Sequence, residues 1–184
     1  MDIYKEKFTK LEREVLRLLF ANSGKKLNQR EIALSLKVSP TAVANSIKNL
    51  GKTGLLDINK NEASETFEIG LNLHNNQTIS MKRVENLRLI YDSGLAEFLS
   101  DHFPGTTIVL FGSYSFGEDS YNSDIDIAII GIKEKSAKLT KLSSFEKVFG
   151  KKIIVQYYED FNKINKNLKE SILNGIILKG SVKL

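Results

Sequence analysis

The sequence contains no cysteine and only two histidines, and these shortages exclude several kinds of site. Without cysteine there is no disulfide framework, thiolate zinc site or cysteine nucleophile. Two histidines argue against an all-histidine metal site and against a Ser-His-Asp triad. No apolar run approaches the ~18 residues of a membrane span, and the first residues, MDIYKEKF, lack the apolar stretch of a signal peptide. We therefore expect a cytoplasmic protein without a membrane partner.

The composition is that of a globular protein. The chain has 184 residues, of which 41% are hydrophobic and 27% charged, which is room for one ordinary domain or two small ones. The formal net charge of +5 permits contact with nucleic acid but does not require it.

Residues 1–76 show a pattern of three helices followed by two short strands. The first helix has apolar residues at three- and four-residue spacing from Phe8 to Leu18, and the second follows Asn28. Ser39 and Pro40 form a strong helix start, with an N-cap hydroxyl before a proline at the first helical position. Strand-like runs at 55–58 and 66–69 flank a polar tip. This order resembles the winged helix-turn-helix family over about residues 8–72.

The third helix of this pattern is the candidate reader of DNA. Its outward positions could reach base edges or phosphates, and these are Thr41, Asn45, Lys48 and Lys52. The predicted hairpin tip carries Lys60 among several glutamates, which is a poor match for a wing that contacts phosphates. A module used for protein contacts is therefore the alternative.

Residues 77–104 are predicted to form a helical linker. Gly94 is a candidate break, and the segment is long enough to serve as the seam of a homodimer. Its apolar face is expected to include Val84, Leu87, Tyr91, Leu95 and Phe98.

Residues 105–184 alternate between strand and helix patterns. The continuous apolar run at 108–111 predicts a strand covered on both faces, and further strands are predicted at 125–130, 153–158 and 176–178. Helical patterns fill 136–149 and 160–174. The overall prediction is an α+β protein: a winged helix followed by a small α/β domain with a mixed sheet.

One stretch of this second domain carries the chemistry. The buried strand runs into Gly112 and Ser113, and ten residues later Asp124 and Asp126 open the next strand. Residues i and i+2 of a strand share a face, so the two carboxylates lie side by side and repel each other without a cation. Mg²⁺ takes oxygen ligands and often combines one or two carboxylates with substrate phosphates. Glycine lets the backbone approach a phosphate, and the serine offers an amide and a hydroxyl.

This arrangement resembles the nucleotidyltransferases of the polymerase beta superfamily, in particular the minimal nucleotidyltransferase group. The resemblance covers about residues 80–181, with Gly117 and Ser123 as further matches. It implies transfer of a nucleoside monophosphate from ATP or another nucleoside triphosphate to a protein or nucleic-acid acceptor. It also implies that Asp124 and Asp126 hold Mg²⁺ or Mn²⁺ and that Gly112 and Ser113 hold the triphosphate.

One departure from the family pattern concerns a third carboxylate on the strand 153–158. The expected position is Gln156, and glutamine cannot act as a base near neutral pH. Glu159 is the nearest acid, but it has the opposite strand parity.

Two other functions remain open. The first is a transcriptional regulator whose C-terminal domain binds nucleotide without turnover. The second is an antitoxin-like protein that nucleotidylates a partner toxin.

Overall fold

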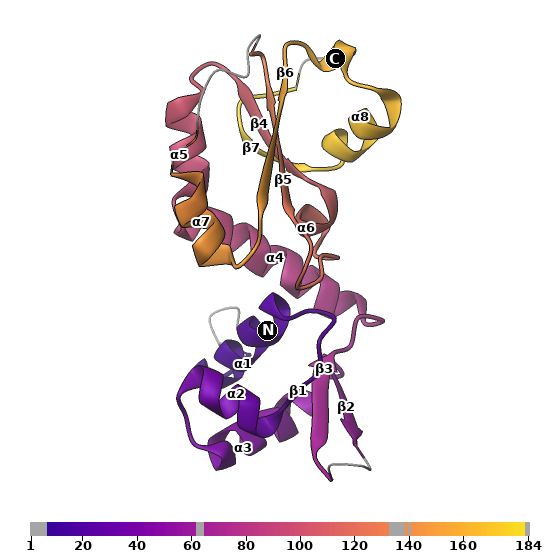
Figure 1. Cartoon of the computed structure of the whole chain (residues 1–184). Helices are drawn as coiled ribbons and strands as arrows, with labels where there is room; N and C mark the ends of the chain where they lie inside the picture. The colour runs from indigo at the N-terminus through magenta and orange to yellow at the C-terminus, as the bar shows by residue number, and fades with distance from the viewer. Residues whose placement is uncertain (1–6, 62–64, 133–138, 140, 183–184) are drawn as a thin grey trace. The chain divides into compact units, whose positions relative to one another are not determined.

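The computed structural model describes residues 7–61, 65–132, 139 and 141–182 and divides into two compact units, residues 1–79 and 80–184 (Figure 1). Each unit is described by itself. No helix in the described part of the chain is long and apolar enough to cross a membrane.

The N-terminal unit contains three helices and a small antiparallel sheet with the strand order β1-β3-β2. The helices are α1 (Lys10–Ala21), α2 (Gln29–Leu36) and α3 (Pro40–Gly51). The strands are β1 (Leu27–Asn28), β2 (Leu56–Lys60) and β3 (Phe67–Leu71). The two-residue strand β1, which pairs with β3, was not predicted.

Local capping explains where these helices begin. Thr9 and Glu12 form a reciprocal capping box at α1, and Asn28 and Glu31 form another at α2. Ser39 caps α3 and is followed by proline, as predicted. Buried apolar residues on the inner faces of the helices then form the core, including Val15, Leu19, Ile32, Val43, Ile47 and Leu50.

The C-terminal unit is built on a four-stranded mixed sheet with the order β6-β5-β4-β7. Its strands are β4 (Thr107–Phe111), β5 (Ile125–Ile130), β6 (Ile153–Tyr158) and β7 (Ile176–Lys179). Strand β5 is antiparallel to β4 and parallel to β6, which confirms the predicted mixed sheet. The helices of the second half are α4 (Asn76–Asp92), α5 (Leu95–His102), α6 (Gly112–Phe116), α7 (Leu142–Phe149) and α8 (Lys166–Leu173).

Both faces of this sheet are covered (Figure 1). Alternate residues of the central strands, such as Ile125, Ile127 and Ile129, pack with α5 and α7 into one core. Ala128 and Ile130 point to the other face, where Phe161 and the helix α8 cover them. Asp126 has the same parity as Ala128, so it lies on the α8 side, at the end of the sheet where β5 begins.

The predicted linker 77–104 is not a separate part of the structure. From Ser80 onward it belongs to the C-terminal unit, because Ile90, Leu95, Leu99 and Phe103 contribute to the core of that unit. The break at Gly94 is present, with φ at +79°, and it separates α4 from α5.

The predicted apolar face of this segment is wrong for α4. Val84 is 69% exposed and Tyr91 51% exposed. The buried positions recur every four residues instead, and they are Thr78, Lys82, Asn86 and Ile90. A buried ion pair between Lys82 and Asp119 allows a lysine to face inward.

The single helix predicted at 160–174 is also divided. Asp160 caps a short 3₁₀ turn, η1 (Phe161–Lys163), and Asn165 caps α8 by accepting a hydrogen bond from the Leu168 amide at 3.0 Å. Two capping residues in close succession favour two separate starts. The predicted helix 136–149 is seen as α7 from Leu142, and most of its first turns lie outside the described residues.

The altered face of α4 gives a stability test. Ile90→Ala should lower the free energy of unfolding of the C-terminal unit by about 2–5 kcal/mol, because it leaves a cavity at a fully buried position. Val84→Ala, at an exposed position on the same helix, should change it by less than about 0.5 kcal/mol. Urea unfolding of the two variants measures both values, and a larger loss for Val84→Ala would contradict the assignment of the buried face.

Candidate functional site

The end of β4 and the start of β5 bring a glycine and a carboxylate into contact. Phe111 pairs with Asp126 in the antiparallel register, so Gly112 follows directly beside that aspartate. A Cβ added at Gly112 would collide with Asp126 Oδ2 and would lie 3.2 Å from Asp126 Cγ. The backbone of Gly112 is also left-handed, with φ at +70°. Both the space and the conformation therefore require glycine here.

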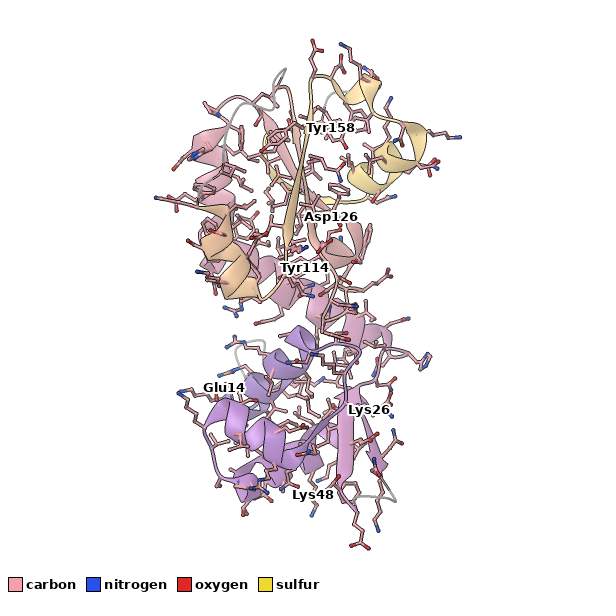
Figure 2. The ribbon with its side chains drawn as sticks, in the orientation of Figure 1. Glu14, Lys26, Lys48, Tyr114, Asp126 and Tyr158 are labelled. Carbon is pink, nitrogen blue, oxygen red and sulfur yellow. The ribbon has the colours of Figure 1, made fainter. Side chains whose placement is uncertain are left out.

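The two predicted metal-binding carboxylates lie close together. Asp124 is exposed and immediately precedes β5, whereas Asp126 is half-buried within the strand (Figure 2). Burial raises the pKa of the Asp126 carboxyl above its ordinary value, and the negative charge of Asp124 raises it further. The flanking residues Ile125 and Ile127 are fully buried on the opposite face and hold the strand in register.

This pair of carboxylates fits a divalent cation. Among the described residues, no lysine, arginine or histidine forms an ion pair with Asp124 or Asp126. The same part of the chain contains no group of three acidic, histidine or cysteine side chains that could hold a metal ion by itself. Two carboxylates with further ligands from a bound phosphate are the kind of set that Mg²⁺ accepts.

The neighbouring strand supplies no acid next to this pair. The parallel register places Ile154, which is 38% exposed, directly beside Asp126, and Gln156 beside Ala128. Gln156 accepts a hydrogen bond from the Tyr158 hydroxyl. That Gln156 replaces the third acid of the family stays a prediction. The register shows in addition that Ile154 is the residue of β6 paired with Asp126.

Glu159 does not substitute for this acid in the structure. It follows the last residue of β6, and its carboxylate forms an ion pair with Lys163 at 2.7 Å.

In the N-terminal unit, the four predicted DNA-contacting residues lie on one exposed face. Thr41, Asn45, Lys48 and Lys52 are all exposed, because Val43, Ile47 and Leu50 turn the other face of α3 into the core (Figure 2 labels Lys48). The nearby β3 residue Glu68 is already paired with Lys26 at 3.4 Å.

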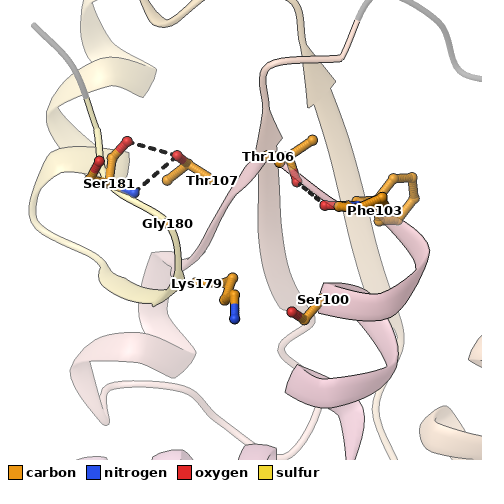
Figure 3. Close-up of a pocket in the computed structure, with 9 residues that line it drawn as sticks. Ser100, Phe103, Thr106, Thr107, Lys179, Gly180 and Ser181 are labelled. Atoms are coloured by element: carbon orange, nitrogen blue, oxygen red, sulfur yellow. Dashed lines mark hydrogen bonds between the residues drawn. The ribbon is translucent and has the colours of Figure 1, made fainter.

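A hollow in the C-terminal unit lies at the opposite end of β4 from Gly112 (Figure 3). Its two threonine hydroxyl groups form hydrogen bonds within the protein. Thr107 donates to the Ser181 carbonyl at 2.7 Å, and Thr106 donates to the Phe103 carbonyl at 2.8 Å. None of the predicted site residues lines this hollow.

Two parts of the chain match protein-family models, in agreement with this geometry. Residues 8–57 match the winged helix-turn-helix DNA-binding family. Residues 93–179, which contain Gly112, Ser113, Asp124 and Asp126, match the nucleotidyltransferase domain family. The chain is therefore a winged helix-turn-helix domain fused to a nucleotidyltransferase domain. A search of curated protein sequences finds no match.

Several solved structures resemble part of the chain. A point mutant of ZitR from Lactococcus lactis is 20% identical over 56% of this chain and 65% of its own, with a TM-score of 0.41. The adhesin competence repressor AdcR from Streptococcus pyogenes is 19% identical over 56% of this chain and 72% of its own, with a TM-score of 0.43. MepR from S. aureus, in a complex with DNA, is 21% identical over 52% of this chain and 81% of its own, with a TM-score of 0.35.

A group of buried polar residues around Asp119 was not predicted from the sequence. They are Lys82, Asn86, Asp119 and Lys151. The regular spacing of Lys82 and Asn86 along α4 was the available signal, but their partner Asp119 is more than 30 residues away in sequence.

The raised pKa of Asp126 predicts that the site costs stability. The folded state binds a proton at Asp126 more readily than the unfolded state does, so ionisation above the unfolded-state pKa destabilises the fold. Asp126→Asn should therefore raise the Tm at pH 7, by less than about 4 °C because the group is half-exposed. The gain should begin to shrink as the pH falls through the raised folded-state pKa of the carboxyl and should vanish below its unfolded-state pKa. Thermal melts of both proteins across this pH range measure the effect, and a lower Tm for Asp126→Asn at pH 7 would contradict it.

Proposed function

We propose that the C-terminal domain binds a nucleoside triphosphate together with Mg²⁺ or Mn²⁺ and transfers its nucleoside monophosphate to a protein or nucleic-acid acceptor. The observation that carries this proposal is the contact between Gly112 and the half-buried Asp126, with Asp124 beside it. This arrangement brings the backbone of Gly112 against a carboxylate that has a second carboxylate beside it, which suits a metal-bound triphosphate.

The residues have distinct roles in this proposal. Asp124 and Asp126 would hold the cation, which when bound neutralises the phosphates and orients them for displacement. Gly112 has no side chain to block the approach of a phosphate to the backbone, and Ser113 offers an amide and a half-exposed hydroxyl next to it. ATP is the first nucleotide to test.

A second function is favoured by the composition of β6. On the face that bears Asp126, this strand presents Ile154, Gln156 and Tyr158, and none of them carries a carboxylate. A regulator that binds nucleotide without turnover is therefore the second candidate. An antitoxin-like enzyme that modifies a partner toxin is a narrower form of the first.

Removal of both carboxylates should abolish metal-dependent binding of ATP. The double variant Asp124→Asn, Asp126→Asn loses the two cation ligands. Isothermal calorimetry with ATP and Mg²⁺ should therefore show a Kd weaker by at least about 100-fold, because loss of outer-shell partners alone costs about 10–100-fold. Glu97→Gln, Asp101→Asn is a matched control, because it removes two exposed acids four residues apart on α5. Equal binding by the site variant and the wild-type protein would exclude this metal site.

A turnover assay distinguishes the enzyme from the regulator that binds nucleotide without turnover. With labelled ATP and Mg²⁺, transfer of label to a protein or nucleic acid and release of pyrophosphate would support the enzyme. Stabilisation of the protein by ATP and Mg²⁺ without release of pyrophosphate would support the regulator.

For the N-terminal domain, we propose that α3 contacts DNA. Lys48→Ala should reduce the slope of log K against log salt for binding to duplex DNA by about 1, because one phosphate contact is lost. Lys10 lies on α1, where its side chain is 85% exposed, and Lys10→Ala should leave the slope unchanged. Fluorescence anisotropy over a salt series measures both. Unaltered binding by Lys48→Ala would contradict the proposal that this face of α3 contacts DNA. If the wild-type protein binds no duplex DNA, the alternative of a module for protein contacts is favoured.

A further inference from the structure

Three buried charged residues form a cluster around the segment that joins Gly112 to Asp124. One of them, Asp119, belongs to this segment, and the other two are lysines from other parts of the chain. Asp119 is the only acid in the cluster, and its side chain is 1% exposed. Lys82, with a side chain that is 0% exposed, donates to its carboxylate and, at 2.8 Å, to its backbone carbonyl. Lys151, 5% exposed, lies 3.2 Å from the second carboxylate oxygen. Asn86 donates to Asp119 Oδ1 at 2.7 Å.

The cluster carries an excess of positive charge in a buried place. Two ammonium groups share one carboxylate, and burial lowers the pKa of Lys82 while the hydrogen bond and charge of Asp119 act against that shift. A buried ion pair is often no more stabilising than apolar residues of the same volume. The stability of the domain is thus a poor explanation for three charges at one buried point, and their contacts indicate a more specific role.

These contacts hold the chain on both sides of Asp119. On the N-terminal side, Asn86 also donates to the Tyr114 carbonyl at 2.9 Å, which ties α4 to α6. On the C-terminal side, Lys151 donates to the Ser120 carbonyl and, at 3.5 Å, to the Ser123 carbonyl. The cluster therefore reaches from the residues after Gly112 to the residue before Asp124.

The segment 120–123 is itself a closed turn. The Ser123 amide donates to the Ser120 carbonyl at 3.1 Å, and the Ser120 amide donates to the Ser123 hydroxyl at 2.9 Å. Because Lys151 binds the carbonyl groups at both ends of this turn, a displacement of Lys151 would move the turn as a unit. Asp124 is the next residue and would move with it.

We propose that Asp119 is a positioning residue for the nucleotide site. Its carboxylate holds Lys151 under the turn 120–123 and thereby fixes the place of Asp124. The inference rests on the proposed function, in which Asp124 holds the metal ion of a metal–nucleoside triphosphate, and it adds a group that does not touch the ligand.

The test compares two affinities of the same protein. Asp119→Asn keeps the shape of the side chain but removes the charge that holds both lysines. The affinity for ATP in the presence of Mg²⁺ should fall about 10–100-fold, the range for lost outer-shell partners of metal ligands. The affinity for ATP in EDTA should change much less, because Gly112 and Ser113 precede the turn. Calorimetry on the full chain, well below the Tm, gives both values.

A role limited to folding predicts a different result. It would lower the Tm and leave the ratio of the two affinities unchanged. Hydrogen exchange gives a readout that needs no ligand, since the amides of Ser120 and Ser123 should exchange faster in Asp119→Asn while those of α3 stay as they are.

Arg88→Met is the matched control. Arg88 forms its ion pairs with Glu85 and Asp92 on α4 itself, and its side chain is only partly buried. Loss of this charge should leave both affinities within about twofold, as for surface changes generally.

A second variant covers the case in which Asp119→Asn does not fold. Lys151→Met leaves the ion pair of Lys82 and Asp119 in place, with one charge of each sign, so the variant should fold. It removes the hydrogen bonds to the carbonyl groups of the turn and should therefore weaken Mg²⁺-dependent binding of ATP by about tenfold. Wild-type affinity in this variant, or in a folded Asp119→Asn, would overturn the positioning role alone. A wild-type protein that binds no ATP with Mg²⁺ would overturn the proposed function, and the positioning role with it.

Discussion

The contact between Gly112 and Asp126 is the constraint on which the C-terminal site depends. It follows from the pairing of β4 with β5, because the register that joins Phe111 to Asp126 places the first residue after β4 against the carboxylate. A side chain at position 112 would meet Asp126 Oδ2, so the position of this aspartate against the backbone requires glycine at 112. The buried residues of both strands hold this register, since a shift of one residue would turn Ile125 and Ile127 out of the core.

The buried lysine of α4 explains why hydrophobic periodicity failed there. A search for apolar residues at helical spacing assumes that the inward face is apolar, and it selects Val84 and Tyr91. In the structure, the inward positions include Lys82 and Asn86, because Asp119 satisfies both. Hydrogen bonds to a residue more than 30 positions away thus allow polar side chains to face inward against the local hydrophobic pattern. A single sequence does not show such distant contacts.

Other features were predictable because their causes are local. The capping residues Ser39 and Asn28 mark helix starts through hydrogen bonds to residues three positions ahead. The proximity of Asp124 and Asp126 follows from the two-residue period of a strand. In contrast, the neighbour of Asp126 on β6 depends on the register between β5 and β6. These strands are paired in the sheet, but the segment that contains α7 lies between them in the sequence. The family resemblance points to Gln156 as the position of the third acid, and only the register shows that Ile154 is the residue paired with Asp126.

The two candidate sites differ in how strongly the structure points to a ligand. The exposed face of α3 needs only that the apolar residues on its other side turn inward, and almost any polar residue at Thr41 or Lys48 would be compatible with the fold. Asp126 is different, because burial and the charge of Asp124 both disfavour its ionised form. Residues that reduce stability in the free protein are characteristic of functional sites, where a bound ligand offsets the cost. The carboxylate pair is therefore the stronger indication of function, and in the function that we propose a bound cation would offset the repulsion between its two members.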